Sequence, residues 1–197
     1  GAKEFFGFED KIKTVFVTGG SQGAQIINDN LLDVLPELLK GYQIIHQCGK
    51  NNLKEVENRV SVLMESSVYK PRYRIYDYLD VNGMRMAYGA SDLIVSRAGA
   101  ASIFEIAASG LPSIIVPLAD SAQDHQRENA YAYAKSGAAE VIEQNNLTPH
   151  VLRSEIEGLL NNKDKLQKMS EEAKKFSKPD AAEKIAREII RLAIEHK

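Results

Sequence analysis

A single acidic residue lies in a segment whose other residues, apart from Arg97, are small or apolar. In the stretch SRAGAASIFEIAASGLP, residues 96–112, Glu105 follows four small residues. These four are Gly99, Ala100, Ala101 and Ser102. Small side chains leave room for a ligand, and the N–H groups at a helix start favour an anion such as phosphate. A carboxylate accepts two hydrogen bonds in parallel, so Glu105 could bind both hydroxyls of a ribose. The alternative is that an acid in the first helical turn only stabilises the helix dipole.

A second candidate site is the glycine-rich segment TGGSQGA, residues 18–24. Its candidate ligand-binding residues are Gly19, Gly20, Ser21, Gln22 and Gly23. Glycines allow a tight turn and a close approach of the backbone to a ligand, and the following helix directs the positive end of its dipole there. These features indicate a phosphate or a sugar nucleotide, with a plain strand-to-helix turn as the alternative. The spacing is neither the dinucleotide fingerprint G-x-G-x-x-G nor a P-loop.

The segment QCGKNN, residues 47–52, follows the second predicted strand. His46, Cys48 and Lys50 could contact a ligand there, but a turn with a buried histidine and a small core cysteine is the favoured interpretation. No acid ends this strand to bind a ribose, which argues against NAD.

The segment PLADSAQDHQRENA, residues 117–130, is a polar loop that leads into a helix. His125, Gln126 and Asn129 crowd this junction, and the last two share one helix face. Uncharged amides and an imidazole suit the hydroxyls of a neutral sugar. The alternative is a solvated loop in which Asp124 caps the helix.

Composition places the chain among soluble globular proteins. Of its 197 residues, 44% are hydrophobic and 26% are charged, and 25 Lys and Arg residues face 27 Asp and Glu residues. This balance gives no indication of nucleic-acid binding. The single cysteine, Cys48, rules out an internal disulfide and fits a reducing compartment. The chain begins Gly-Ala-Lys without methionine, so we expect a piece of a longer protein, with residues 1–12 as a linker.

Apolar runs alternate with segments of helical periodicity along most of the chain. The runs occupy residues 13–18, 42–47, 73–79, 92–96, 112–117 and 138–143. Most are continuous in Val, Ile and Leu, which is typical of parallel strands buried on both faces. Only helices are predicted after Glu143, beginning with Thr148 as N-cap and Pro149 at the first helical position. We therefore predict a Rossmann-like, doubly wound α/β domain with about six parallel strands and C-terminal helices.

Four segments together carry a family resemblance. GGSQGA, HQCGK, SRAGAASIFEIAASGLPSIIVP and DHQRENA stand here in the order, and with about the spacing, found in the C-terminal domain of glycosyltransferase family 28. The resemblance runs from about Lys11 to the last helix. It implies one half of a two-domain GT-B arrangement, with residues 13–197 as the UDP-sugar donor-binding domain. The N-terminal acceptor domain would be absent, and with it the catalytic base.

The resemblance also implies a reaction. Family members that build peptidoglycan transfer GlcNAc, with inversion, from UDP-GlcNAc to a lipid-linked muramoyl-pentapeptide. By this resemblance the chain binds UDP-GlcNAc and holds no catalytic residue of its own. We expect no cofactor, and no metal for donor binding, because no Asp-x-Asp site stands near the phosphate segments and helix N-termini can carry the charge instead. The chain alone would be soluble, and the full-length protein would be cytoplasmic and peripheral on the inner membrane. Two alternatives remain, a UDP-GlcNAc 2-epimerase-like half and a non-catalytic nucleotide-sugar-binding subunit.

Residue roles follow from the same resemblance. Ser21 and the amides of the glycine-rich segment 18–24, hereafter the first glycine segment, would face the donor. The amides of residues 100–102 would hold the diphosphate and Glu105 the ribose. Gln126 and Asn129, with His125 near them, would bind the GlcNAc hydroxyls. The uracil would bind the backbone near Tyr78 and Leu79.

Overall fold

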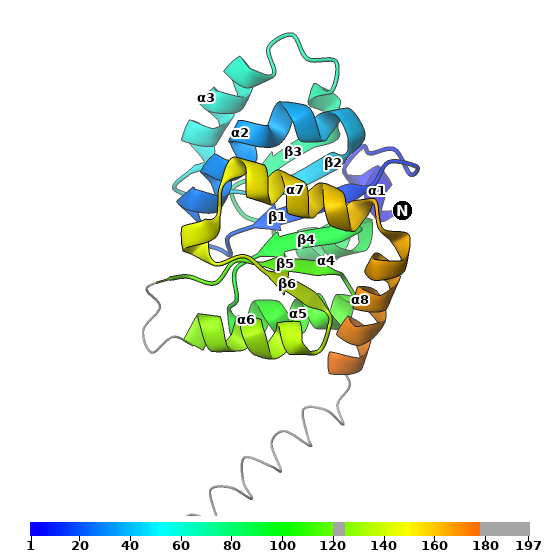
Figure 1. Ribbon diagram of the computed structural model, residues 1–197. Helices are drawn as coiled ribbons and strands as arrows, with labels where there is room; N and C mark the ends of the chain where they lie inside the picture. Colours follow the sequence, from blue (N-terminus) through cyan, green and yellow to red (C-terminus); the bar gives the residue numbers. More distant parts are fainter. Residues whose placement is uncertain (120–124, 178–197) are drawn as a thin grey trace, which may run out of the picture.

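The computed structural model describes residues 1–119 and 125–177, and within them it forms a single six-stranded parallel sheet in the order β3-β2-β1-β4-β5-β6 (Figure 1). The strands are β1 (Thr14–Thr18), β2 (Gln43–Gln47), β3 (Tyr73–Tyr76), β4 (Leu93–Ser96), β5 (Ser113–Ile115) and β6 (Ala139–Val141). All six predicted strands are confirmed, and the predicted Rossmann-like class with them. The third, fifth and sixth are shorter than predicted, because the chain leaves the sheet at Tyr76, Ile115 and Val141.

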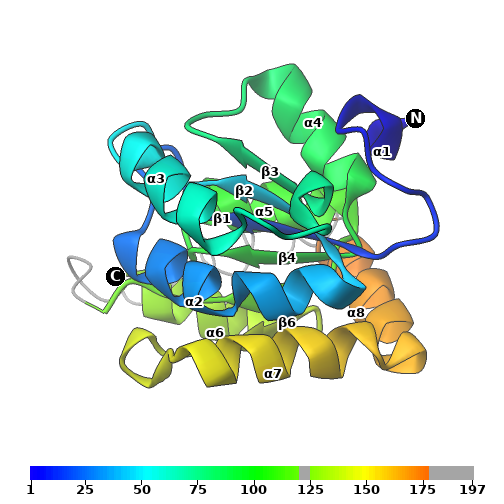
Figure 2. The ribbon, with the colours of Figure 1, turned by 90° about the horizontal axis from the view of Figure 1, so that it is seen from above.

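Helices cover both faces of the sheet. They are α1 (Ala2–Phe5), α2 (Gln25–Gly41), α3 (Leu53–Leu63), α4 (Val81–Ala90), α5 (Ala100–Ser109), α6 (His125–Lys135), α7 (Pro149–Leu160) and α8 (Lys163–Phe176), with short 3-10 helices η1 (Lys70–Arg72) and η3 (Gln144–Asn146). Figure 2 shows α2 and α7 on one side of the sheet and α4 on the other.

The two faces of the sheet bury separate apolar clusters. On β1, Val15 and Val17 pack with residues of α2, α3 and α7, whereas Phe16 packs with residues of α4, α5 and α6. Every residue of β1 is buried. The alternate residues of such a strand face two helix layers, so both faces of the strand are buried and largely apolar. This explains the continuous apolar runs of the sequence.

The first C-terminal helix, α7, begins as predicted. The Thr148 hydroxyl accepts a hydrogen bond from the Val151 N–H at 3.1 Å, with Pro149 in the first turn of α7. The Asn162 side chain caps α8 in the same way. The part of the predicted C-terminal helices that follows Ser177 lies outside the described residues.

Residues 1–12, which the sequence predicted as a linker, pack onto the domain instead. Helix α1 lies against α4 (Figure 2), and Phe6 and Phe8 are buried in the same cluster as Phe16. The Gln43 side chain donates to the carbonyl of Glu9 at 3.0 Å and accepts from its N–H at 2.7 Å. Burial of the Phe6 and Phe8 rings offsets the cost of ordering this short segment.

A histidine lies fully buried in the middle layer of the fold. His46, on β2, places its Nδ1 atom 2.8 Å from the Tyr73 hydroxyl and its Nε2 atom 2.8 Å from Asn28 Oδ1. Burial lowers the pKa of His46 to about 3. Of the two interpretations of His46 and Cys48, the structure shows the buried one, since both side chains are inaccessible to solvent.

Burial of His46 predicts a pH dependence of stability. The folded protein keeps His46 neutral down to a pKa of about 3, whereas the unfolded chain takes up the proton near pH 6.5. Stability is therefore lost as the pH falls below about 6.5. Between pH 7 and pH 5 this one group should remove about 2 kcal/mol from the free energy of unfolding.

Urea unfolding of wild type and of His46→Gln at both pH values measures this loss. The variant should be less stable at pH 7 and lose less between pH 7 and 5. His150→Gln, which changes an exposed histidine of α7, is the matched control and should keep the wild-type pH dependence. Equal pH dependence in wild type and His46→Gln would contradict the prediction.

Candidate functional site

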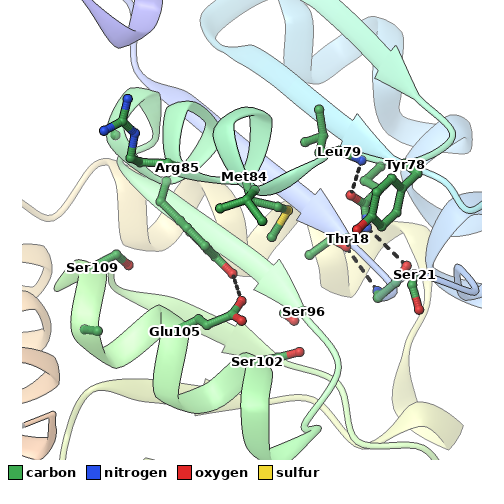
Figure 3. Close-up of a pocket in the computed structure, with 16 residues that line it drawn as sticks. Thr18, Ser21, Tyr78, Leu79, Met84, Arg85, Ser96, Ser102, Glu105 and Ser109 are labelled. Carbon is green, nitrogen blue, oxygen red and sulfur yellow. Dashed lines mark hydrogen bonds between the residues drawn. The ribbon is translucent and has the colours of Figure 1, made fainter.

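A cavity of about 770 Å³ opens at the carboxyl ends of the strands. It lies where β1 and β4 pair side by side, with Thr18 opposite Ser96, and from there the chain order runs outward in both directions. In doubly wound sheets this switch point is where ligands bind. Its walls come from the first glycine segment, the loop after β3, and helices α4 and α5 (Figure 3).

Several predicted site residues line this cavity and others do not. Those on its wall are Gly20, Ser21, Leu79, Ser102 and Glu105. Those that are not on its wall are Gly19, Gln22, Gly23, Gly99, Ala100, Ala101, His125, Gln126 and Asn129. The cavity thus unites the predicted phosphate, ribose and base regions, but not the predicted sugar-binding residues.

Glu105 directs its carboxylate into the cavity (Figure 3). It is the sixth residue of α5, which begins at Ala100, so it stands in the second helical turn and not in the first as the sequence suggested. Charge–dipole stabilisation falls off within the first turn of a helix. This placement therefore weakens the interpretation that Glu105 only stabilises its own helix.

Tyr88 holds the Glu105 carboxylate from the opposite wall. Its hydroxyl donates to Glu105 Oε2 at 3.0 Å, and its ring packs edge-to-face against buried Phe16 at 5.9 Å between centroids. Desolvation, followed by the charge of Glu105, raises the pKa of Tyr88. Tyr88 is therefore a permanent donor at neutral pH, and its hydrogen bond engages one of the two carboxylate oxygens of Glu105.

Gln47 ties three segments together at the floor of the cavity. Its Oε1 accepts from the Leu79 N–H at 2.9 Å, and its Nε2 donates to the Gly20 carbonyl at 3.2 Å and to the Thr18 hydroxyl at 3.3 Å. Only 3% of its surface is exposed.

Sequence analysis missed Gln47 and Tyr88. For Gln47 the available signal was a polar residue at the end of a buried strand. Tyr88 stands three residues after Arg85 and four after Met84, a spacing that places it on the same face of α4 as these two cavity residues.

The first glycine segment rests on the loop after β2. Gly23 has a φ of +74°, and a Cβ there would lie 2.1 Å from the Cys48 carbonyl oxygen. Gly49 has a φ of +93°, and its Cβ would lie 2.5 Å from the Gln22 carbonyl oxygen. Gly19 and Gly23 thus serve close backbone packing, while Gly20 and Ser21 face the cavity.

The loops on the far side of β4 hold the remaining predicted residues. Gly99 is the N-cap of α5, and Ala100 and Ala101 form its exposed first turn. Asn129 donates to the Ala98 carbonyl at 3.2 Å, and Gln126 accepts from the Leu118 N–H at 3.0 Å. Asp124 lies outside the described residues. A sugar-binding role for α6 therefore stays a prediction.

Comparison with known proteins identifies the family. The family model described as the glycosyltransferase family 28 C-terminal domain matches residues 14–185. The chain belongs to this family. Among curated relatives, the UDP-N-acetylglucosamine–N-acetylmuramyl-(pentapeptide) pyrophosphoryl-undecaprenol N-acetylglucosamine transferase of Chlorobium luteolum is 38% identical over 195 residues, which are 98% of this chain and 51% of the relative. The corresponding transferase of Natranaerobius thermophilus is 32% identical over 178 residues, which are 89% of this chain and 48% of that protein.

Solved structures agree with the family 28 assignment. The crystal structure of MurG from Acinetobacter baumannii superposes with a TM-score of 0.74 at 30% identity, covering 92% of this chain and 53% of that one. A UDP-GlcNAc 2-epimerase from Neisseria meningitidis, bound to UDP-GlcNAc, reaches a TM-score of 0.64 at 14% identity, covering 96% of this chain and 47% of that one. The second likeness shows the fold alone.

The family 28 chain described here spans about half the length of the curated relatives it matches. Over residues 1–119 and 125–177, none of the helices has both the length and the apolar character of a membrane span. In the same part of the chain, no three His, Cys, Asp or Glu side chains gather where they could hold a metal ion.

Removal of the Gln47 amide should loosen the cavity floor. Gln47→Met keeps the side-chain length and leaves the Leu79 N–H and the Gly20 carbonyl without their partner. An unsatisfied buried group costs about 1–3 kcal/mol, so the free energy of unfolding should fall by about 2 kcal/mol. Gln167→Met changes an exposed glutamine of α8 and should cost less than about 0.5 kcal/mol. Equal losses in the two variants, measured by urea unfolding, would contradict the bridging role.

Proposed function

We propose that the chain is the donor-binding half of an N-acetylglucosaminyltransferase and binds UDP-GlcNAc in the cavity at the β1–β4 switch point. The names of the curated relatives and the family 28 assignment support this donor. Within the structure one observation supports it above the others: a carboxylate, held by Tyr88 through one oxygen, faces a cavity large enough for a nucleotide.

The diphosphate would lie between the first glycine segment and the start of α5. Both are strand-to-helix junctions, and the N–H groups at the start of α5 supply donors and the positive end of a dipole. Ser21 and Ser102 add hydroxyls on the cavity wall. Glu105 follows Ala100 by five residues, or about 7.5 Å along the helix axis. That separation suits a ribose that follows directly on the diphosphate.

The uracil would lie beyond the ribose, against the loop after β3. The N–H of Leu79 already donates to Gln47, and the N–H of Tyr78 donates to the Asp77 side chain at 2.7 Å. The Leu79 carbonyl would then accept a hydrogen bond from the base. The GlcNAc would extend toward α6, where Gln126 and Asn129 are the candidate contacts.

The chain would hold the donor without transferring the sugar. Transfer to the lipid-linked muramoyl-pentapeptide, with inversion, needs a base beside the acceptor, and we assign no residue of this chain to that role. The acceptor-binding half, and a peripheral position of the whole protein on the inner membrane, belong to the same proposal.

An epimerase-like function has less support. Epimerisation beside the acetamido group needs groups that move a proton, for which acids and a histidine in the cleft are expected. Among the described residues on the cavity wall, Glu105 is the sole carboxylate and no histidine is present. A donor held by phosphate and ribose contacts fits this wall better.

Calorimetric titration of the chain tests the proposed donor. UDP and UDP-GlcNAc should bind, UDP-GlcNAc should bind more tightly than UDP-GalNAc, and NAD should not bind. No GlcNAc should reach a lipid-linked acceptor, and no epimerised UDP-sugar should form. Failure to bind UDP would overturn the proposal, and transfer by this chain alone would overturn the assignment of catalysis to another domain.

The ribose contact of Glu105 can be tested separately. Hydrogen bonds to a charged group contribute roughly 1.5–3 kcal/mol, and 1.4 kcal/mol corresponds to a factor of ten. Glu105→Gln should therefore weaken UDP binding by about tenfold or more, with little change in melting temperature. Tyr88→Phe should weaken it less, because the carboxylate remains but loses its fixed orientation.

Two controls sharpen this test. Glu65→Gln removes an exposed carboxylate away from the cavity wall and should leave UDP affinity unchanged. With 2′-deoxy-UDP, which lacks one of the two hydroxyls, Glu105→Gln should lose much less affinity than with UDP. An equal loss with both nucleotides would show that Glu105 does not bind the diol.

A further inference from the structure

A chain of buried hydrogen bonds runs behind the first glycine segment, on the side of the sheet away from the cavity wall of α4 and α5. The Tyr73 hydroxyl lies 2.8 Å from His46 Nδ1, and His46 Nε2 lies 2.8 Å from Asn28 Oδ1. The Asn28 amide nitrogen donates to the Cys48 carbonyl at 3.0 Å. These residues come from β3, β2, α2 and the loop after β2, and none exposes more than 7% of its surface.

The hydrogen bonds in this series all run in one donor-to-acceptor direction. The Cys48 carbonyl can only accept, so the Asn28 amide must turn its nitrogen toward it and its oxygen toward His46. His46 Nε2 must then carry the proton, and Nδ1 accepts from the Tyr73 hydroxyl. Burial lowers the pKa of His46 to about 3, so the ring is neutral and has this one donor and one acceptor.

This series of hydrogen bonds ends at the loop after β2, which supports the first glycine segment. The Cys48 carbonyl receives a second hydrogen bond from the Asn52 amide at 2.8 Å, so both of its acceptor positions are filled. The same oxygen is the atom against which Gly23 packs without a Cβ. A shift of this carbonyl would therefore shift the backbone of residues 22–23, and with it Gly20 and Ser21 on the cavity wall.

We propose that Asn28 and His46 are positioning residues, which fix the first glycine segment, residues 18–24, by holding the Cys48 carbonyl from behind. Neither residue lines the cavity. An apolar side chain could fill the Asn28 position and would avoid the cost of burying an amide. Ile27 and Leu31, in the same helix, are buried apolar residues of this kind. What an apolar residue cannot supply is a directed hydrogen bond to one carbonyl. The effect on donor binding rests on the proposed function; the effect on the glycine segment does not.

Asn28→Asp is the informative variant, because it is nearly isosteric. The aspartate can still accept from His46 Nε2, but it places an oxygen where the donor to the Cys48 carbonyl stood. Asn30→Asp is the matched control. Asn30 lies in the same helix, exposes 8% of its surface, and donates at 2.7 Å to the Ile26 carbonyl of its own helix. Both variants bury a new carboxylate in α2, but only the first breaks the contact with the loop.

Amide hydrogen exchange reports the glycine segment without any ligand. The N–H of Gly20 bonds to the Thr18 hydroxyl and that of Gly23 to the Gly20 carbonyl, each at 3.0 Å, so both exchange rates report local order. Asn28→Asp should accelerate exchange at these two amides by at least about tenfold, and Asn30→Asp should not, with the rates compared at equal global stability set by urea. Tyr73→Phe, which removes the far end of the chain, should give a smaller acceleration and serves if Asn28→Asp does not fold.

UDP titration of the same proteins gives the functional outcome. Asn28→Asp should weaken UDP binding several-fold and Asn30→Asp should not. Unchanged exchange at Gly20 and Gly23 in Asn28→Asp, or equal acceleration in Asn30→Asp, would overturn the inference. Altered exchange with unaltered UDP affinity would overturn the link to donor binding. If wild type does not bind UDP, the proposed function fails, whereas the exchange comparison still decides the positioning role.

Discussion

The structure depends on a parallel sheet that is buried on both faces. Parallel strands need long crossover connections, and here these are helices that lie on opposite sides of β1 and β4. The change of side leaves the carboxyl ends of these two strands without a covering helix between them. The cavity, the two glycine-containing loops and the start of α5 all lie where this topology opens the sheet.

Two buried side-chain amides at the end of the sheet find their hydrogen-bond partners within the protein itself. Gln47 and Asn28 each use a side-chain amide to join a strand or helix to a loop, one on the cavity side and one behind it. Gln47 holds the loop after β3 and the first glycine segment, and Asn28 holds the loop after β2. The groups that face the cavity are therefore placed before any ligand arrives. Such preorganisation reduces the ordering that binding would otherwise require.

The sequence alone predicted the six strands well because burial on both faces leaves a continuous apolar pattern. Site residues within one segment, such as Ser102 and Glu105, were also found, since small residues after a strand are a local signal. The sequence placed Glu105 in the first turn of its helix, and this prediction was wrong. Helix α5 begins at Ala100, and no side-chain cap marks that start in the sequence. Tyr88 and Gln47 act through partners 17 and 32 residues away, and such pairings depend on tertiary packing that local patterns do not contain.

The bond between Gln47 and the Leu79 N–H has a consequence for base selectivity. With that N–H engaged, the backbone at Leu79 can offer a base an acceptor but no donor. A pyrimidine that meets this carbonyl with ring position 3 would have to present an N–H there. Uracil and thymine carry that proton, whereas cytosine presents a lone pair, which the carbonyl would repel. In the proposed donor site one buried glutamine would thus favour uridine over cytidine nucleotides at ring position 3, by engaging the N–H that cytosine N3 would otherwise accept from.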